Sequence, residues 1–108
     1  NSYGQISDIK LKENIVDASP KLNDLMKVRI VNYNLKADLG YDSNKQIGVI
    51  AQEVQKVLPE VVSISKDHGY FVIDYPKLNA ILVEGIKEHQ LFIEDINNQI
   101  AELENKFK

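Results

Sequence analysis

Residues 78–108 read LNAILVEGIKEHQLFIEDINNQIAELENKFK, and this segment sets the architecture expected for the whole chain. It holds no proline and a single glycine, and it is rich in Glu, Leu, Ile and Lys, which favours a helix. Its apolar residues recur every seven positions in two series. The series are Ile86, Ile93, Ile100 and Phe107, and Leu82, His89, Ile96 and Leu103. Seven of these eight residues are apolar, a pattern typical of a coiled-coil seam.

We expect the helix to begin at Pro76, with Asp74 as its cap. At about 1.5 Å per residue, roughly 32 residues form a rod of about 48 Å, longer than the core of so small a domain covers. The first turns, with Leu78, Ile81 and Leu82, are expected to pack on their own domain. Isoleucine at both seam positions disfavours a dimer, and we expect a parallel trimer. The alternative, a helix folded back on its own domain, lacks a second helix long enough to cover it.

His89 is the polar residue of the predicted seam. We expect it to set register and oligomeric state, as polar seam residues do in other coiled coils. A pH switch and an anion site on the threefold axis are the alternatives.

Residues 1–75 predict a small mixed head, so the fold class is α+β: short strands and two short helices, followed by a long C-terminal helix in a trimeric coiled coil. The first short helix has Ser19 as its cap and Pro20 at its first position. The other expected elements are a strand over 29–35, an exposed loop over 37–46, a brief strand over 47–50, a helix over 51–58 stopped by Pro59, and a hairpin joining 61–64 to 70–73.

Composition excludes several classes of function. The chain has 108 residues, the size of one domain, and a net charge of −3 with a pI near 5.3, so we expect no nucleic-acid partner. No apolar run approaches the length of a membrane span, and we expect no membrane partner. The chain has no cysteine, and His68 and His89 are its two histidines, so we expect no metal and no cofactor.

Few residues of this chain are candidates for a catalytic role. Ser7 and Lys12 are a candidate pair because a lysine amine with a lowered pKa can activate a serine hydroxyl. The spacing alone is uninformative in a chain with six serines and twelve lysines, where solvated charges are the simpler interpretation. Gln52 and Glu53, at the start of the central helix, are most simply solvated first-turn residues, with Glu53 near the positive end of the helix.

Three segments, in order and spacing, resemble the intramolecular chaperone and auto-processing domain at the C-terminus of phage tail spikes, endosialidases and neck appendages, a domain also found in a eukaryotic membrane-tethered transcription factor. SDIKLKENI, residues 7–15, is similar to the family's self-cleavage motif, a Ser-Asp pair with a Lys five residues after the Ser. IGVIAQEVQKVLPEVV, residues 47–62, is similar to its central block. Val72, Asp74, Tyr75 and Leu78, leading into LVEGIKEH, are similar to the start of its coiled-coil helix. Lys10 stands where the family often has Arg, which keeps the charge and loses a bidentate fork.

The resemblance implies that the chain trimerises, brings three copies of an upstream fibre into register, and is then released by cutting the bond between Ile6 and Ser7. Ser7 would be the nucleophile and a neutral Lys12 the general base of a Ser-Lys dyad that acts once. Asp8 would orient Lys12 or hold the turn, and Gln52 is the candidate oxyanion donor.

On this interpretation residues 1–6 are the remnant of an upstream fibre or spike body, 7–75 the head with the motif, and 76–108 the trimerisation helix. The expected partners are further copies of the chain and the upstream body of the same precursor. The expected place is the host cytoplasm during virion assembly, with the upstream product in the virion and the released chaperone outside the mature particle. Two alternatives stay open: a trimerisation module that does not cut, and a regulatory domain that cuts itself to release an upstream effector such as a transcription factor.

Overall fold

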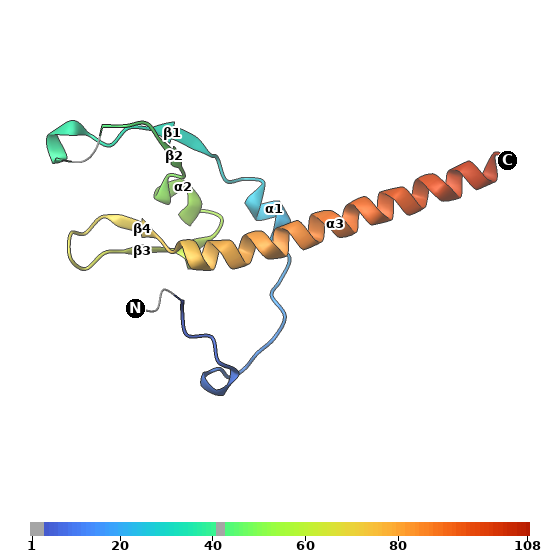
Figure 1. Ribbon diagram of the computed structural model, residues 1–108, viewed down its shortest axis with the longest axis horizontal. Coiled ribbons are helices and arrows are strands. Elements are labelled where there is room, and N and C mark those ends of the chain that lie inside the picture. The colour runs from blue at the N-terminus through green and yellow to red at the C-terminus, as the bar shows by residue number, and fades with distance from the viewer. Residues whose placement is uncertain (1–3, 41–42) are drawn as a thin grey trace.

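A computed structural model describes residues 4–40 and 43–108, and it confirms the expected α+β class. The molecule measures 68 × 40 × 29 Å, with a small head at one end of a long helix (Figure 1). Residues 1–3 of the expected remnant, and Tyr41 and Asp42 of the expected loop, lie outside the described residues.

The long helix α3 runs from Tyr75 to Lys106. Asp74 caps it as predicted, since its carboxylate accepts a hydrogen bond from the backbone N–H of Lys77 at 3.1 Å. Pro76 lies in the first turn, where its missing N–H would have had no partner within the helix. These local signals were enough to predict where α3 begins.

Two antiparallel hairpins make up the strands of the head. Strand β1 (Val31–Tyr33) pairs with β2 (Gln46–Gly48), and β3 (Val62–Ile64) pairs with β4 (Phe71–Ile73). The β3–β4 hairpin was predicted, and β1 lies within the strand predicted over 29–35. Gly69, in the turn between β3 and β4, has a φ of 76°, a left-handed conformation that glycine adopts without strain. The strand expected over 47–50 is shifted: Val49 follows β2, and Ile50 instead becomes the N-cap of the next helix.

The short helices differ from the prediction at their ends. Helix α1 is Leu22–Leu25 and its N-cap is Lys21, so the prediction that Ser19 caps it was wrong. Helix α2 is Ala51–Gln55, and the N–H of Leu58 still donates to the carbonyl of Val54 at 2.7 Å beyond its end. A 3₁₀ turn, η3 (Pro59–Val61), then leads into β3.

The core lies where α2, η3 and the first turns of α3 meet. Its buried side chains are Val54, Leu58, Val61, Leu78 and Ile81. Packing of Leu78 and Ile81 against the head was predicted and is confirmed, whereas Leu82, expected beside them, is 42% exposed. The five side chains buried among the described residues are a small core for a domain of this length, so the single chain gains little of the burial that stabilises larger folds.

Beyond the head, α3 projects alone. Every residue from His89 to the end of the chain is exposed, so the helix does not fold back on its own domain. In the part of the chain that the structure describes, no helix is both long enough and apolar enough to span a bilayer.

Candidate functional site

The predicted Ser-Lys pair lies on one tight turn near the N-terminus. Ser7 precedes the 3₁₀ turn η1 (Ile9–Leu11), and Lys12 follows it. Because η1 turns the chain back on itself, two residues five positions apart come into contact. Lys12 Nζ donates a hydrogen bond to Ser7 Oγ at 2.7 Å, so the structure brings the two side chains together.

Asp8 is the residue that builds this turn. Its Oδ1 accepts a hydrogen bond from the backbone N–H of Lys10 at 2.9 Å, and its carbonyl accepts from the N–H of Leu11 at 3.0 Å. The N–H of Lys12 donates to the carbonyl of Ile9 at 3.1 Å. Of the two roles expected for Asp8, these contacts correspond to holding the turn.

The contact has the geometry that general-base catalysis requires, with the accepting group within hydrogen-bond reach of the hydroxyl. A lysine amine also has to be neutral when it accepts the proton, and this requires that it leave water or lie beside another cation. All residues from 4 to 20 are exposed in the single chain. One copy therefore brings the two side chains together and leaves them in water.

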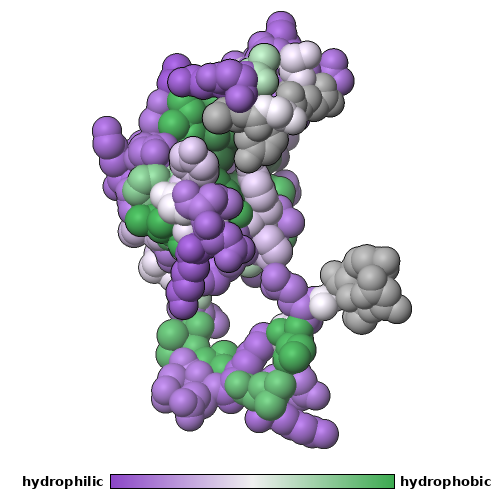
Figure 2. Space-filling view, turned by 90° about the vertical axis from the view of Figure 1, so that its left-hand side faces the viewer, coloured by the Kyte–Doolittle hydropathy of each residue, from purple (hydrophilic) through white to green (hydrophobic). Residues whose placement is uncertain are grey.

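Residues 4–20 stand off the rest of the molecule, and we name them the cleavage segment because they contain the bond between Ile6 and Ser7 that the resemblance implies is cut. In Figure 1 this segment lies mostly on the side of α3 opposite α2 and the β1–β2 hairpin, and Figure 2 shows it as a separate lobe that carries hydrophobic surface. Its exposed large apolar side chains are Ile6, Ile9, Leu11, Ile15 and Val16, each at least 63% exposed. Several exposed apolar side chains gathered in one short segment are typical of a region that another molecule covers.

Gln52, the candidate oxyanion donor, lies away from the pair. It is exposed in α2 and lines an open groove of about 540 Å³ between the two hairpins, together with Tyr33, Tyr70 and Tyr75. Within residues 4–40 and 43–108, no hydrogen bond joins Gln52 to Ser7 or Lys12. The single chain does not bring it to the pair.

Glu53, the neighbour of Gln52, forms a bidentate ion pair. Its two carboxylate oxygens accept hydrogen bonds from Arg29 Nε at 3.1 Å and Arg29 Nη2 at 2.6 Å. The hydrogen bond to Arg29 holds the pKa of Glu53 below its ordinary value, and the pKa of Arg29 is raised in return. The pair joins α2 to the residues before β1, which is a structural role.

The predicted seam forms an apolar stripe along α3 that the single chain leaves uncovered. Its members Leu82, Ile86, Ile93, Ile96, Ile100, Leu103 and Phe107 are between 41% and 85% exposed, and His89 is exposed among them. An amphipathic helix with such an apolar stripe is stable when the stripe is buried against other helices.

Glu88 makes a contact that no local pattern in the sequence indicates. From the side of α3 it accepts hydrogen bonds from the backbone N–H groups of Lys21, at 2.7 Å, and Leu22, at 3.3 Å. It thus supplies the cap that Ser19 was expected to give α1. The partners lie more than 60 positions apart, so only the tertiary structure reveals the contact.

Comparison with known proteins assigns the sequence to a family. The model of peptidase family S74, described as the chaperone of endosialidase, matches residues 7–63, from the serine of the pair into β3. The chain belongs to this chaperone-of-endosialidase family.

Two relatives come from very different sources. The chain is 32% identical over 105 residues to myelin regulatory factor homolog 1 of Caenorhabditis elegans, a match that covers 89% of this chain. It is 31% identical over 103 residues to long tail fiber protein Gp37 of Salmonella phage S16, a match that covers 94% of this chain. It spans 11% and 14% of the lengths of these relatives. The region is therefore one part of each larger protein.

Proposed function

We propose that this chain is the C-terminal intramolecular chaperone of a trimeric phage fibre or spike, and that it releases itself by cutting the bond between Ile6 and Ser7. In this proposal residues 1–6 belong to the upstream body, 7–75 form the head, and 76–108 form the trimerisation helix. Assembly takes place in the host cytoplasm, and the released chaperone is left out of the mature virion.

The observation that carries the proposal is the 2.7 Å hydrogen bond between Lys12 Nζ and Ser7 Oγ. Ser7 is also the first residue of the family match, as expected if the family domain begins at the cut. The relative from Salmonella phage S16 is a tail fibre by name, and it supports a fibre as the upstream body.

The proposed cut proceeds by an acyl shift followed by hydrolysis. Ser7 Oγ attacks the carbonyl carbon of Ile6 while neutral Lys12 takes the hydroxyl proton. The bond between that carbon and the Ser7 nitrogen breaks, and Lys12 returns the proton to the nitrogen, which leaves an ester between Ile6 and Ser7 Oγ. Water then hydrolyses the ester to a carboxylate on Ile6 and a free hydroxyl on Ser7.

Assembly controls this reaction in our proposal. The cleavage segment is exposed in one copy, so the cover that takes Lys12 out of water comes from neighbouring copies or from the folded upstream body. Gln52 remains the candidate oxyanion donor, supplied once the segment is covered. The cut thus follows trimerisation and does not precede it.

A trimeric chaperone of this kind solves a kinetic problem. Interwound fibres have many contacts between residues distant in sequence, so they fold slowly when three chains have to find one register. A coiled coil that holds the chains together lowers the cost of that search. Removal of the coil after folding makes the mature fibre kinetically stable, because separated chains would not find the register again.

The relative from C. elegans favours a second candidate. It is a regulatory factor by name, which fits a domain that cuts itself to release an upstream effector such as a transcription factor. The two candidates share the head, the coil and the cut, and they differ in what lies upstream. A trimerisation module that does not cut is the remaining alternative.

The decisive experiment uses the precursor with its upstream body, as wild type and as Ser7→Ala. Mass spectrometry of the wild type should give a new N-terminus at Ser7, and Ser7→Ala should remain one chain while forming the same oligomer. Ser19→Ala is the matched control, since Ser19 lies in the same exposed segment, and it should be cut like the wild type. A wild-type precursor that trimerises with this bond intact would leave only the trimerisation module.

A further inference from the structure

We infer that Glu88 is a positioning residue for the cut: from α3 it holds α1, the helix through which the cleavage segment is attached to the trimerisation helix. This inference rests on the proposed function. Glu88 does not contact Ser7 or Lys12, and in this inference it affects the cut by fixing the position of α1.

Helix α1 depends on a cap from outside its own segment. It has four residues, and its N-cap Lys21 offers no side-chain cap. Isolated helices of one turn are unstable because none of their first N–H groups has an internal partner. Both oxygens of Glu88 meet this need, Oε2 at the N–H of Lys21 and Oε1 at the N–H of Leu22.

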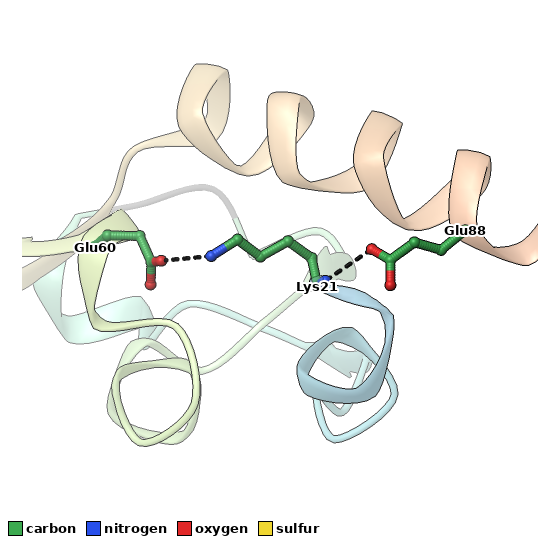
Figure 3. A network of polar contacts seen from close by, with 3 residues as sticks. All are labelled: Lys21, Glu60 and Glu88. Atoms are coloured by element: carbon green, nitrogen blue, oxygen red, sulfur yellow. Dashed lines mark hydrogen bonds and ion pairs between the residues drawn. The ribbon is translucent and has the colours of Figure 1, made fainter. Parts of the chain in front are cut away.

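The side chain of Lys21 makes a second contact. Its Nζ lies 3.4 Å from a carboxylate oxygen of Glu60 in η3, and its side chain is 16% exposed. Figure 3 shows Lys21 stretched between Glu60 and Glu88, with its backbone at one carboxylate and its amine at the other. The residue that follows the cleavage segment is thereby fixed to both the head and the long helix.

The packing of α1 supports the same arrangement. Leu25 lies over Gly85 so closely that a Cβ on Gly85 would collide with Leu25 Cδ1. Gly85 and Glu88 are three positions apart, so they share one face of α3. This face, one turn long, provides both the space and the cap that α1 uses.

The seam lies directly beside this face. Ile86 follows Gly85 and His89 follows Glu88, and both are seam positions. When three helices engage along the seam, the rotation of each α3 about its axis becomes fixed. Because Glu88 and Gly85 hold α1 to α3, the C-terminal end of the cleavage segment, next to α1, is then placed at a defined angle to the neighbouring copies. The hydrogen bonds of Glu88 thus link assembly of the coil to the position of the dyad.

The experiment compares three variants of the full precursor: Glu88→Ala, Glu88→Gln and, as control, Glu102→Ala, which removes the same charge from an exposed position of the same helix. Glu88→Ala should form the trimer and cut about tenfold more slowly, the effect expected from loss of a helix cap. Glu88→Gln keeps one carbonyl oxygen as acceptor and should recover part of the rate. Glu102→Ala should cut like the wild type.

Hydrogen exchange separates positioning from a general loss of structure. In Glu88→Ala, amides of residues 7–25 should exchange faster than in Glu102→Ala, while those of the core around Val54 and Leu58 should be unchanged. Equal cleavage rates in Glu88→Ala and the wild type would overturn the inference and leave the proposed function intact. Loss of the trimer in both Glu88 variants would also overturn it, by assigning Glu88 to folding. An uncut wild type would instead reject the proposed function itself.

Discussion

Lys10 and Lys12 lie in the same turn, and Lys12 is the one whose amine reaches Ser7 Oγ. Lys12→Arg in the precursor should abolish the cut, because a guanidinium stays protonated and cannot accept the serine proton. Lys10→Arg is the matched control and should preserve the cut. N-terminal sequencing and the ratio of cut to uncut chain measure both. A cut at normal rate in Lys12→Arg would exclude Lys12 as the base.

The Arg29–Glu53 pair predicts a small dependence of stability on pH. The pKa of Glu53 is lowered in the folded chain, so its contribution is present above the unfolded value of about 4.3 and is lost as pH falls through the folded pKa. The melting temperature of the wild type should exceed that of Glu53→Gln at pH 6, and the difference should shrink towards pH 3. Because the pair is solvent-exposed, the difference should be small even at pH 6. A gap that widens on acidification would contradict this sign.

Some residue roles could be predicted from the sequence and others could not. Asp74 as a cap and Gly69 in a turn follow from local chemistry, and both were found from sequence. The Ser7–Lys12 pair came from the family resemblance, since the spacing alone carries no information. Glu88 could not be found in either way, because its role depends on packing between distant segments.

At the scale of elements, long periodic patterns were more informative than short ones. The seven-residue repeat predicted the long helix, and Asp74 with Pro76 predicted its start to within one residue, whereas the short strand over 47–50 was displaced to Gln46–Gly48. Three-residue strands have too few side chains to fix their own ends. Where such a strand ends therefore depends on where the next element begins. Here Ile50 serves α2 as its N-cap, which removes it from the strand.

The seam of α3 yields a prediction about His89. If three copies bury this position, His89→Leu should replace a polar layer by an apolar one and raise the melting temperature of the trimer by about 5 °C or more. Asn98→Leu, on the outer face of the same helix, should produce no such rise. Thermal melts at several concentrations measure this, and equal effects of the two variants would place His89 outside the seam.

For the whole molecule, the small core and the uncovered helix both indicate that a single copy needs further copies of the chain to bury its apolar surface. The five side chains buried in the part of the chain that the structure describes stabilise the head weakly, and the seam is uncovered in one copy. We predict that Ile93→Asp with Ile100→Asp yields monomers, because every copy would bring charges to a buried layer. Sedimentation equilibrium should give the mass of one chain, against three for the wild type and for Asn98→Asp.

The same double variant tests control by assembly. In the precursor it should prevent the cut although Ser7 and Lys12 are unchanged, because no neighbour remains to cover the cleavage segment. A cut at the normal rate in a demonstrated monomer would mean that one chain completes the site by itself.

Because residues 4–20 make few contacts with the rest of the molecule, they also have the properties of a tether. Fully extended, they span about 55 Å, whereas a flexible chain of that length has ends about 22 Å apart on average. Three such tethers on one coil would confine three upstream chains to a sphere a few nanometres across, a local concentration on the order of millimolar. Until neighbouring copies cover the segment and fix the dyad, each upstream chain would still be free to slide and rotate against the others while it searched for register. Confinement and freedom of movement would then both come from one exposed segment.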